Sequence, residues 1–410
     1  MSENQEKVDA KKASAQSSMV EDDRLLKLAV IGTGNCGGQM VNAACETLGI
    51  DGVAINGSQK DLDLITCPKV VKIPVGDGKG TGKDRDKAKD FFLADSGIVL
   101  DPKFIKVVEK HDVIVIVTST GGGFGSGSST ELLELLQGMY ENKIFIVAGV
   151  LPFQDEGTAA FEHTKGWLKE IGALNPTYMI YDNNRFAGKV SPNRAAMMIN
   201  EAFVRDLQVL QGDFITTTMT GGIDQRDMAT VLSVPGRIFI DSMTGLERAD
   251  VDGSLINTIK QHIEKESAHA ELVNDKEILA SALMYSLGEE FDDYKIGVKN
   301  DLQEAFGAHI KDMSNCSDED EGTIAIVLSG LTEPAMVIDR LIAKVQKMEE
   351  TILNRKAQMS KLNKIDTESK LQSVTAKQSF AEESSVVKAT GGGDSKEELL
   401  KKFMAKKTGK

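Results

Sequence analysis

The chain has 410 residues, 41% of them hydrophobic, so it is long enough for two domains with buried cores. Its formal net charge of −14 argues against a body that binds nucleic acid or an anionic membrane. Four cysteines without a Cys-x-x-Cys pair are too few for a disulfide framework and favour a reducing compartment. No apolar run is long enough to span a membrane, and the N-terminus lacks the apolar core of a signal peptide. A cytoplasmic location is therefore expected.

Residues 1–24 are rich in Lys, Ser, Glu and Asp and are predicted to form a disordered arm. Within 25–192, amphipathic stretches separate six short apolar runs: KLAVI, GVAIN, KVVKIP, DVIVIVTS, KIFIVAGV and PTYMIYD. Buried strands that alternate with helices predict an α/β domain, a parallel sheet with helices on both faces. The following stretch, 193–212, is apolar on most sides and predicts a long helix buried between two bodies.

Residues 213–333 are predicted to form a second α+β domain. GRIFIDSM and TIAIVLSGL are interpreted as strands, whereas 255–273 and 274–287 are interpreted as helices. Apolar residues recur at helical spacing through 334–362, which predicts an extended helix that projects or contacts a partner. The polar segment 363–410 is predicted to be a flexible tail. Its last fifteen residues hold six Lys and two Glu, a local charge of +4.

Two glycine-rich loops follow predicted strands. In the first, VIGTGNCGGQM, Gly32, Gly34 and Gly37 satisfy G-x-G-x-x-G, so a Rossmann-type NAD-dependent oxidoreductase is one hypothesis. The second strand, however, ends in Asn56 rather than in an acidic residue that would bind the ribose. The second loop, GGGFGSG at 121–127, follows the fourth strand and places further amides at the same sheet edge. Two such loops favour a nucleoside triphosphate, although a merely flexible second loop is the alternative.

The loops together resemble those of the tubulin/FtsZ superfamily. GNCGGQ (34–39) resembles the first nucleotide loop of tubulin, and GGGFGSG is similar to the tubulin/FtsZ sequence GGGTGSG. Six further segments resemble the remaining loops and the central helix in the same order: 54–62, 76–88, 149–157, 182–186, 199–203 and 221–232. The resemblance covers about 27–240 and implies the tubulin/FtsZ fold, with GTP or GDP and Mg²⁺ as ligands.

The resemblance also implies a role for individual residues. The nucleotide ligands would be Gly34, Asn35, Cys36, Gly37, Gly38 and Gln39 for the diphosphate; Asn56 in the second loop; Lys79, Gly80 and Thr81 over the γ-phosphate; Gly121, Gly122, Gly123, Phe124, Gly125, Ser126 and Gly127 for the outer phosphates; Glu156 for the ribose; and Asn183 and Asn200 for guanine. A helix-surface asparagine is the alternative for Asn200. No metal-ligating residue is predicted.

Hydrolysis requires a group that orients or deprotonates water, and the loops contain no obvious base. The resemblance implies that a neighbouring subunit in a head-to-tail filament supplies it, through Asp224 and Asp227. The alternative, which does not exclude this role, is that both acids stabilise a helix N-terminus. The chain is thus expected to be a GTPase completed across the subunit interface.

Three positions depart from the family pattern. Phe124 replaces a threonine, Ala160 stands where FtsZ has arginine, and Ala196 stands where an aromatic residue stacks on guanine. The lost threonine hydroxyl is worth about 1 kcal/mol as a net hydrogen bond. We therefore expect Phe124→Thr to bind GTP at least as well, with the ring packed against the loop or turned toward a neighbouring subunit.

The long helix and the tail are more similar to those of the plasmid and phage tubulins TubZ and PhuZ than to FtsZ. The leading hypothesis is a dynamic filament that positions plasmid or phage DNA, with a DNA-bound adaptor at the tail and no direct membrane contact. The Lys-rich tip could instead contact an acidic neighbour such as 317–321, or be simply solvated. An FtsZ-like division GTPase, a non-hydrolysing scaffold and the oxidoreductase remain the alternatives.

Overall fold

The computed structural model of the protein describes residues 26–212, 223–251, 254–272, 278–288, 291, 310–311, 314–315, 322–332, 335–368, 398 and 401. The predicted N-terminal arm, the acidic run 317–321 and nearly all of the tail beyond residue 368 lie outside these ranges. The first two residues of the segment 221–232 lie outside them as well.

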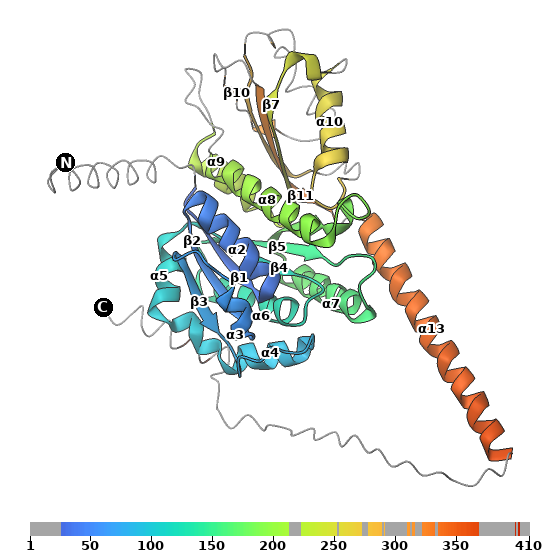
Figure 1. Cartoon of the computed structure of the whole chain (residues 1–410). Helices are drawn as coiled ribbons and strands as arrows, with labels where there is room; N and C mark the ends of the chain where they lie inside the picture. The colour runs from blue at the N-terminus through green and yellow to red at the C-terminus, as the bar shows by residue number, and fades with distance from the viewer. Residues whose placement is uncertain are drawn as a thin grey trace, which may run out of the picture.

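Six parallel strands form the first half of the sheet (Figure 1). They are β1 (Leu28–Thr33), β2 (Asp51–Asn56), β3 (Val70–Pro74), β4 (Val113–Ser119), β5 (Ile144–Leu151) and β6 (Thr177–Asp182). Their order is β3-β2-β1-β4-β5-β6, and all neighbouring pairs are parallel. The six predicted runs coincide with these strands, so the predicted parallel sheet is confirmed.

Helices cover both faces of this sheet, because alternate residues of each strand point to opposite sides. Leu28 and Val30 of β1 belong to one core, whereas Ala29 and Ile31 belong to the other. The first core contains side chains of α2 and α8, and the second contains side chains of α4, α5, α6 and α7. The helices of the domain are α2 (Gly34–Leu48), α3 (Gln59–Asp63), α4 (Arg85–Ala94), α5 (Pro102–Lys110), α6 (Gly123–Met139) and α7 (Thr158–Leu174), with short 3₁₀ turns η1 (Ser96–Leu100) and η2 (Asn183–Arg185).

The long helix α8 (Pro192–Gln211) connects the two halves of the molecule (Figure 1). The Ser191 side chain caps its first turn, and Gly212 ends it in a left-handed conformation. A helix of this length is roughly 30 Å long. It begins after the carboxyl end of β6 and runs across the sheet, burying ten side chains, as the apolar pattern predicted.

A smaller antiparallel unit follows α8. β7 (Gly236–Leu246) pairs with β11 (Gly322–Leu331), and β11 pairs with β8 (Ala280–Ser286), while β7 joins β6 over only two residue pairs. A third core lies between these strands and α10 (Leu255–Glu266). The remaining elements are α9 (Gln225–Leu232), η3 (Arg248–Asp250), β9 (Ile310–Lys311) and β10 (Ser314–Asn315).

Two predictions for this unit were wrong. The segment 274–287 was predicted to be a helix, but 280–286 is strand β8, which pairs with β11 over seven residues. Its residues favour helices in isolation, and a strand buried on both faces lacks the alternation that would reveal it. The helix predicted over 255–273 ends at Glu266, and the residues after it run beside β6. There the Asp182 amide donates to the Ala268 carbonyl, and the Ala270 amide donates to the Ile180 carbonyl.

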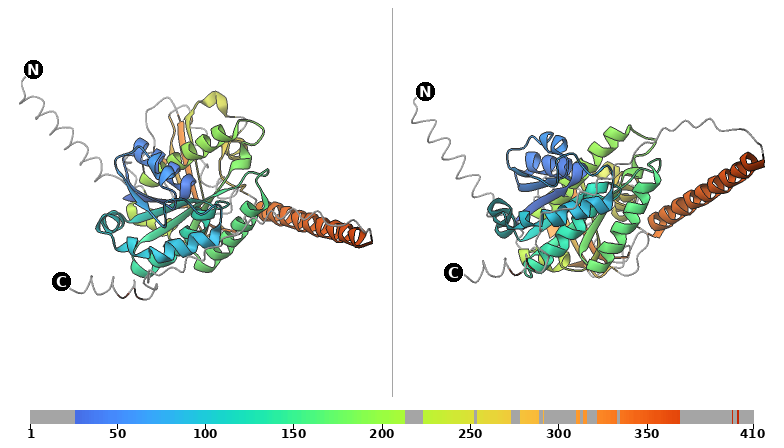
Figure 2. Two further views of the ribbon diagram at one scale, coloured as in Figure 1. Left: turned by 60° about the horizontal axis from the view of Figure 1, so that its bottom comes forward. Right: turned by 90° about the horizontal axis from the view of Figure 1, so that it is seen from below.

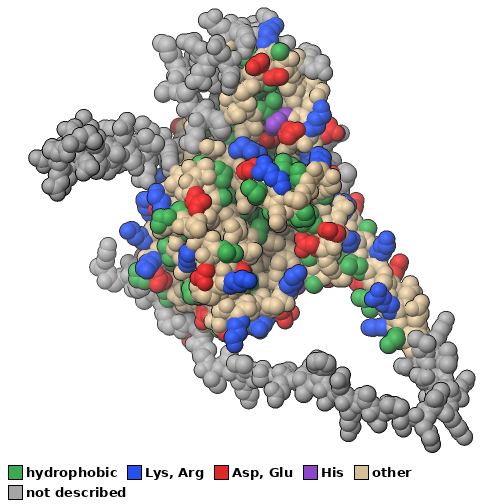
Figure 3. Space-filling model, viewed as in Figure 1, with side chains coloured by type: hydrophobic (Ala, Val, Ile, Leu, Met, Phe, Trp, Pro, Cys, Tyr) green, Lys and Arg blue, Asp and Glu red, His purple; other side chains and the backbone are tan. Residues whose placement is uncertain are grey.

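The last helix, α13 (Ala335–Glu368), leaves the body as a long arm (Figure 2). Val337, Leu341 and Val345 pack into the core that contains α7. Beyond this seat, most side chains up to residue 359 are exposed, and both charge types are spread along the arm (Figure 3). Within the described ranges, no helix is long and apolar enough to cross a membrane.

Candidate nucleotide site

The two glycine-rich loops meet at one point of the sheet. β1 and β4 are neighbours in register, with Thr33 opposite Thr118, and each strand leads into a helix, α2 or α6. The chain turns from β1 toward β2 on one side and from β4 toward β5 on the other. In open α/β sheets, ligands bind at the carboxyl edge where the strand order reverses in this way.

Glycine is required where the loops touch. Gly34 has a φ of +73°, and a Cβ atom there would lie 3.0 Å from the Gly125 nitrogen. At Gly37, a Cβ atom would lie 2.3 Å from the carbonyl oxygen of Val117. The Thr33 hydroxyl also donates to the Gly125 carbonyl at 3.3 Å. The first turns of α2 and α6 are thus fixed against each other, which places two sets of backbone amides side by side.

Three helices of this domain begin without a side-chain cap. The N-cap residues of α2, α6 and α7 are Thr33, Gly122 and Gly157, and none accepts a hydrogen bond from its helix through a side chain. These helices follow β1, β4 and β5, three adjacent strands. By contrast, side chains of Ser58, Asp84, Asp101 and Ser191 cap α3, α4, α5 and α8. Uncapped N-termini present free N–H groups and the positive end of the helix dipole to an anion.

The third loop, 76–84, closes over this point. It is held to the loop after β2, because the Gly80 amide donates to the Gly57 carbonyl at 2.7 Å and the Gln59 amide donates to the Gly78 carbonyl at 2.9 Å. A Cβ atom at Gly123 would lie 2.6 Å from the Cα of Lys83, so the loop lies directly on the first residue of α6. Of the residues predicted near the γ-phosphate, Lys79 is exposed and Thr81 is buried.

Phe124 packs inside the molecule. Only 7% of the residue is exposed, and a Cβ atom at Gly57 would lie 3.0 Å from its ring. The sequence led us to expect a ring packed against the glycine loop or turned toward a neighbouring subunit; the ring is instead buried against the loop after β2. The ring supports the loop after β2, a role that the sequence did not reveal, so Phe124→Thr would remove packing as well as add a hydroxyl.

The residues predicted for the sugar and base lie farther along the same edge. Glu156 accepts a hydrogen bond from the Phe153 amide at 3.0 Å. Burial, together with the nearby Glu156 charge, raises the pKa of Cys36 to about 12, so Cys36 is a neutral thiol beside this carboxylate. Asn183 donates to the Leu151 carbonyl at 2.9 Å, but its buried Oδ1 accepts no hydrogen bond within the described part of the chain. A buried acceptor without a donor is unusual, and a ligand that donates a hydrogen bond would satisfy it.

Not every predicted ligand faces the edge with free polar atoms. Asn56 is 4% exposed, donates to Asp61 and accepts from the Ser58 amide, so its side chain shapes the second loop. Asn200 is half-buried on α8. Ala160 packs against Gly121, and Ala196 is exposed on α8. The other predicted residues lie in the first two turns of α2 and α6; they are Asn35, Gly38, Gln39, Ser126 and Gly127.

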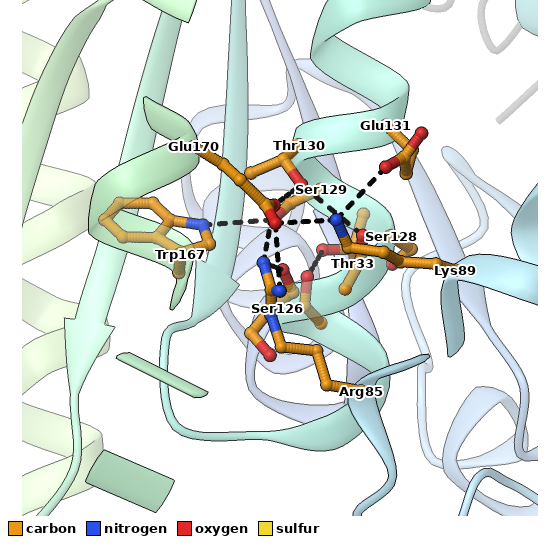
Figure 4. Close-up of polar contacts among 12 residues, drawn as sticks. Thr33, Arg85, Lys89, Ser126, Ser128, Ser129, Thr130, Glu131, Trp167 and Glu170 are labelled. Carbon is orange, nitrogen blue, oxygen red and sulfur yellow. Dashed lines mark hydrogen bonds and ion pairs between the residues drawn. The ribbon is translucent and has the colours of Figure 1, made fainter. Parts of the chain in front are cut away.

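An ionic cluster that the sequence did not reveal lies behind the glycine loop (Figure 4). Glu170 of α7 accepts from Arg85 at 2.5 Å, from Lys89 at 2.6 Å and from Thr130 at 2.6 Å. Burial alone would raise the pKa of Glu170, but these hydrogen bonds lower it to about 2. Arg85 also donates to the Ser126 carbonyl at 3.2 Å. The cluster therefore ties α4, which follows the third loop, to the first turns of α6.

The two predicted catalytic acids lie at the opposite edge of the sheet. Asp224 and Asp227 form a capping box at the start of α9, which bears out the helix-stabilising role. Gln225, which follows Asp224, donates to Asp112 at 3.3 Å, and Asp112 directly precedes β4. The glycine loop follows the other end of β4, a strand of seven residues or roughly 20 Å. Within one chain, these acids do not meet the nucleotide loops.

Comparison with known proteins identifies the domain. Residues 27–191 match the family described as Tubulin/FtsZ family, GTPase domain. These residues form a tubulin/FtsZ GTPase domain. The predicted family resemblance is confirmed for this part of the chain, and the match speaks against the NAD-dependent oxidoreductase, as does the engaged side chain of Asn56.

Curated relatives and solved structures extend the similarity. The tubulin-like protein CetZ3 of Haloferax volcanii is 27% identical over 57% of this chain and 68% of its own length. For two further tubulin-like relatives, of the CetZ type, the alignment covers 62% and 54% of their lengths. A GTPγS-bound protofilament of CetZ2 from Haloferax volcanii superposes with a TM-score of 0.64, at 19% identity, over 79% of this chain and 99% of that one. TubZ from Bacillus thuringiensis serovar israelensis, a GTPγS-form protofilament, gives 0.68 at 17% identity over 82% and 95%. The predicted tubulin/FtsZ fold is thereby confirmed.

Proposed function

We propose that the protein binds GTP along the carboxyl edge of its sheet, assembles head to tail, and hydrolyses the GTP of one subunit with acids of the next. The observation that carries the proposal is that the predicted nucleotide loops and the predicted catalytic acids lie far apart in one chain. Every predicted nucleotide loop lies at one edge, while Asp224 and Asp227 lie at the other. Only a second copy, stacked end to end, can bring the two together. Such a contact is heterologous and does not close, so it generates an open filament.

The phosphates would be bound by the free amides of α2, α6 and α7. The glycines suit this role, because at Gly34, Gly37 and Gly123 a side chain would collide with backbone atoms. Lys79, Gly80 and Thr81 would contact the γ-phosphate from the third loop and so distinguish triphosphate from diphosphate. Mg²⁺ prefers phosphate oxygens and water with few protein ligands, so the triphosphate would supply most of its coordination.

Glu156, Asn183 and Asn200 would recognise the nucleoside. A ribose hydroxyl can donate to the Glu156 carboxylate. Asn183 Oδ1, which accepts no hydrogen bond from the described residues, can accept from the guanine edge. Guanine presents adjacent donors there, whereas adenine presents a different pattern. This arrangement supports GTP over ATP.

Hydrolysis would use the carboxylates of the next subunit to orient the attacking water. Asp224 is exposed and Asp227 is half-buried, so both can approach a neighbour. Their role as a cap is compatible with this chemistry, because it fixes their geometry before the interface forms. Two solved structures with this fold are named as protofilaments bound to, or in the form of, GTPγS, which supports assembly as the setting of the reaction.

The cellular role proposed is the positioning of plasmid or phage DNA, with the tail beyond α13 as the attachment point for a DNA-bound adaptor. The long projecting α13 and the Lys-rich tip support it. An FtsZ-like role in division would use the same chemistry with other partners, and FtsZ of Azotobacter vinelandii is also a relative, at 23% identity.

The test follows assembly and turnover together. Light scattering, sedimentation and phosphate release are measured on the full chain with GTP, ATP or NAD. We expect assembly and phosphate release with GTP above a critical protein concentration, weaker responses with ATP and none with NAD. The absence of nucleotide-dependent assembly with all three would overturn the proposal.

A further inference from the structure

The first turns of α13 are attached to two loops of the nucleotide edge. Arg340 forms an ion pair with Asp182, with 2.7 Å between Nη2 and Oδ2. One turn later, the Lys344 ammonium donates to the Gln154 carbonyl and lies 4.9 Å from the centre of the Phe161 ring. Asp182 ends β6, and Gln154 follows β5. Two cationic side chains of α13 therefore hold this helix, each by a contact with one of the two loops.

Asp182 shapes the loop that contains the predicted base ligand. Only 3% of its side chain is exposed, and its Oδ1 accepts from the backbone amide of Asn184 at 2.9 Å and from the side chain of Asn184 at 2.7 Å. Asn183, whose Oδ1 lacks a partner among the described residues, lies between these two positions. Arg340 binds the other oxygen of the same carboxylate, so it orients this turn from behind.

The two loops also hold each other. The Asn184 side chain accepts from the Gln154 amide at 2.8 Å and donates to the Pro152 carbonyl at 3.1 Å. Glu156 and Asn183, the predicted ribose and guanine ligands, therefore belong to one hydrogen-bonded unit. A shift of Asp182 or of Gln154 would therefore change the positions of both Glu156 and Asn183.

The seat of α13 leaves room for movement. A cavity of about 290 Å³ lies between the helix and the loops, lined by apolar groups such as Pro152, Phe161 and Leu341 and by the stems of Arg340 and Lys344. Close-packed contacts resist displacement, whereas a cavity spanned by two long side chains permits it. On the side that faces the loops, Arg340 and Lys344 of α13 can thus adjust their positions while Val337, Leu341 and Val345 stay in the core.

We propose that Arg340 is a positioning residue for nucleotide binding, and that nucleotide occupancy and the seating of α13 are coupled through Asp182. This inference rests on the proposed function. A ligand that orders the loop stabilises the Arg340–Asp182 pair, and by reciprocity a seated α13 raises nucleotide affinity. The position of the exposed part of α13 beyond residue 345 would thereby depend on whether a nucleotide is bound.

The test compares Arg340→Ala and Arg340→Lys with the matched control Arg355→Ala, which removes an exposed arginine farther along the same helix. GDP and GTP affinities are measured by calorimetry on the full chain, with the GTP titrations below the assembly concentration. Arg340→Ala is expected to weaken both nucleotides by about tenfold and to equal degrees, because the contact acts on the nucleoside loops and not on the γ-phosphate. Arg340→Lys should recover part of the loss, and Arg355→Ala should bind as the unchanged protein does.

A second measurement separates coupling from mere stabilisation. Hydrogen exchange of residues 337–347 is followed with and without GDP. In the unchanged protein GDP should slow exchange in this segment, and in Arg340→Ala it should not. The inference would be overturned if Arg340→Ala bound both nucleotides within twofold of the unchanged protein, or if GDP did not change the exchange rate of α13 in the unchanged protein. Either result would leave the proposed function standing. Failure of the unchanged protein to bind either nucleotide would overturn both.

Discussion

The three helices that follow β1, β4 and β5 begin differently from α3, α4, α5, α8 and α9. α2, α6 and α7 start at residues whose side chains make no cap, two of them glycines. α4, α5 and α9 start at aspartates that bond to their own first turn. An N-cap stabilises a helix by about 1 kcal/mol, so its omission from three helices that follow adjacent strands costs stability. The difference supports the proposal that a ligand hydrogen-bonds to these amides.

The same contrast separates the two edges of the sheet. At the carboxyl edge, α2, α6 and α7 begin without a side-chain cap, whereas at the amino edge the Asp224 carboxylate accepts from the backbone amides of Arg226 and Asp227 in α9. Uncapped helix N-termini at one edge and two carboxylates at the other suit the end-to-end stacking proposed above.

Gly122→Asp would give α6 an aspartate cap like those of α4, α5 and α9, and we expect it to have the largest effect of the variants proposed. Gly122 has a φ of −74°, and its Cβ atom would lie 3.6 Å from the nearest side-chain atom, so aspartate fits as the cap of α6. We expect GTP affinity to fall at least about 100-fold, because like charges brought together cost several kcal/mol. Thermal unfolding should show equal or slightly higher stability. Gly122→Asn, which caps without charge, is the control and should keep most of the affinity; equal losses in both would mean that α6 does not face phosphate.

Mixing two inactive variants tests whether the edges belong to different subunits. Asp227→Ala should bind GTP and assemble but release phosphate about 100-fold more slowly. Gly122→Asp, which should bind GTP only weakly, still carries Asp227. A one-to-one mixture should release phosphate at least about fivefold faster than the sum of its parts, because an intact acid now meets a filled site. The double variant Gly122→Asp/Asp227→Ala replaces the second partner as the control. A mixture no faster than that control would place the acids outside the reaction.

Glu170→Gln should have the smallest effect. It measures how much the ionic cluster behind the glycine loop contributes to the free energy of unfolding. The folded pKa of about 2 lies below the ordinary value of 4.5, so the charged form stabilises the fold above pH 4.5, and this stability is lost as pH falls toward 2. With allowance for the partial exposure of this carboxylate, the variant should lose about 2 kcal/mol at pH 7 and progressively less below pH 4.5. Denaturant unfolding at pH 7 and pH 3.5 measures this, with the exposed Glu162→Gln as the control. A pH-independent difference would show that packing, not charge, is involved.

The sequence predicted those features that depend on short segments. The six parallel strands were recognisable as apolar runs, and the glycine loops by their spacing after β1 and β4. β8 was missed because its burial comes from pairing with β11, which no local pattern reports. The links that support the site were missed for the same reason. Arg85 and Glu170 are 85 residues apart, and Asp182 and Arg340 are 158 apart, so only the folded chain brings them together.

The length of α8 has a consequence for the proposed filament. The helix starts beside the nucleotide edge and ends toward the edge that carries Asp224, and its 20 residues correspond to roughly 30 Å. If each nucleotide lies between one subunit's loops and the next subunit's acids, the length of this helix along the filament axis contributes to the spacing of successive nucleotides. In the proposed filament, Ser191 and Gly212, which define the ends of the helix, would therefore influence the axial repeat.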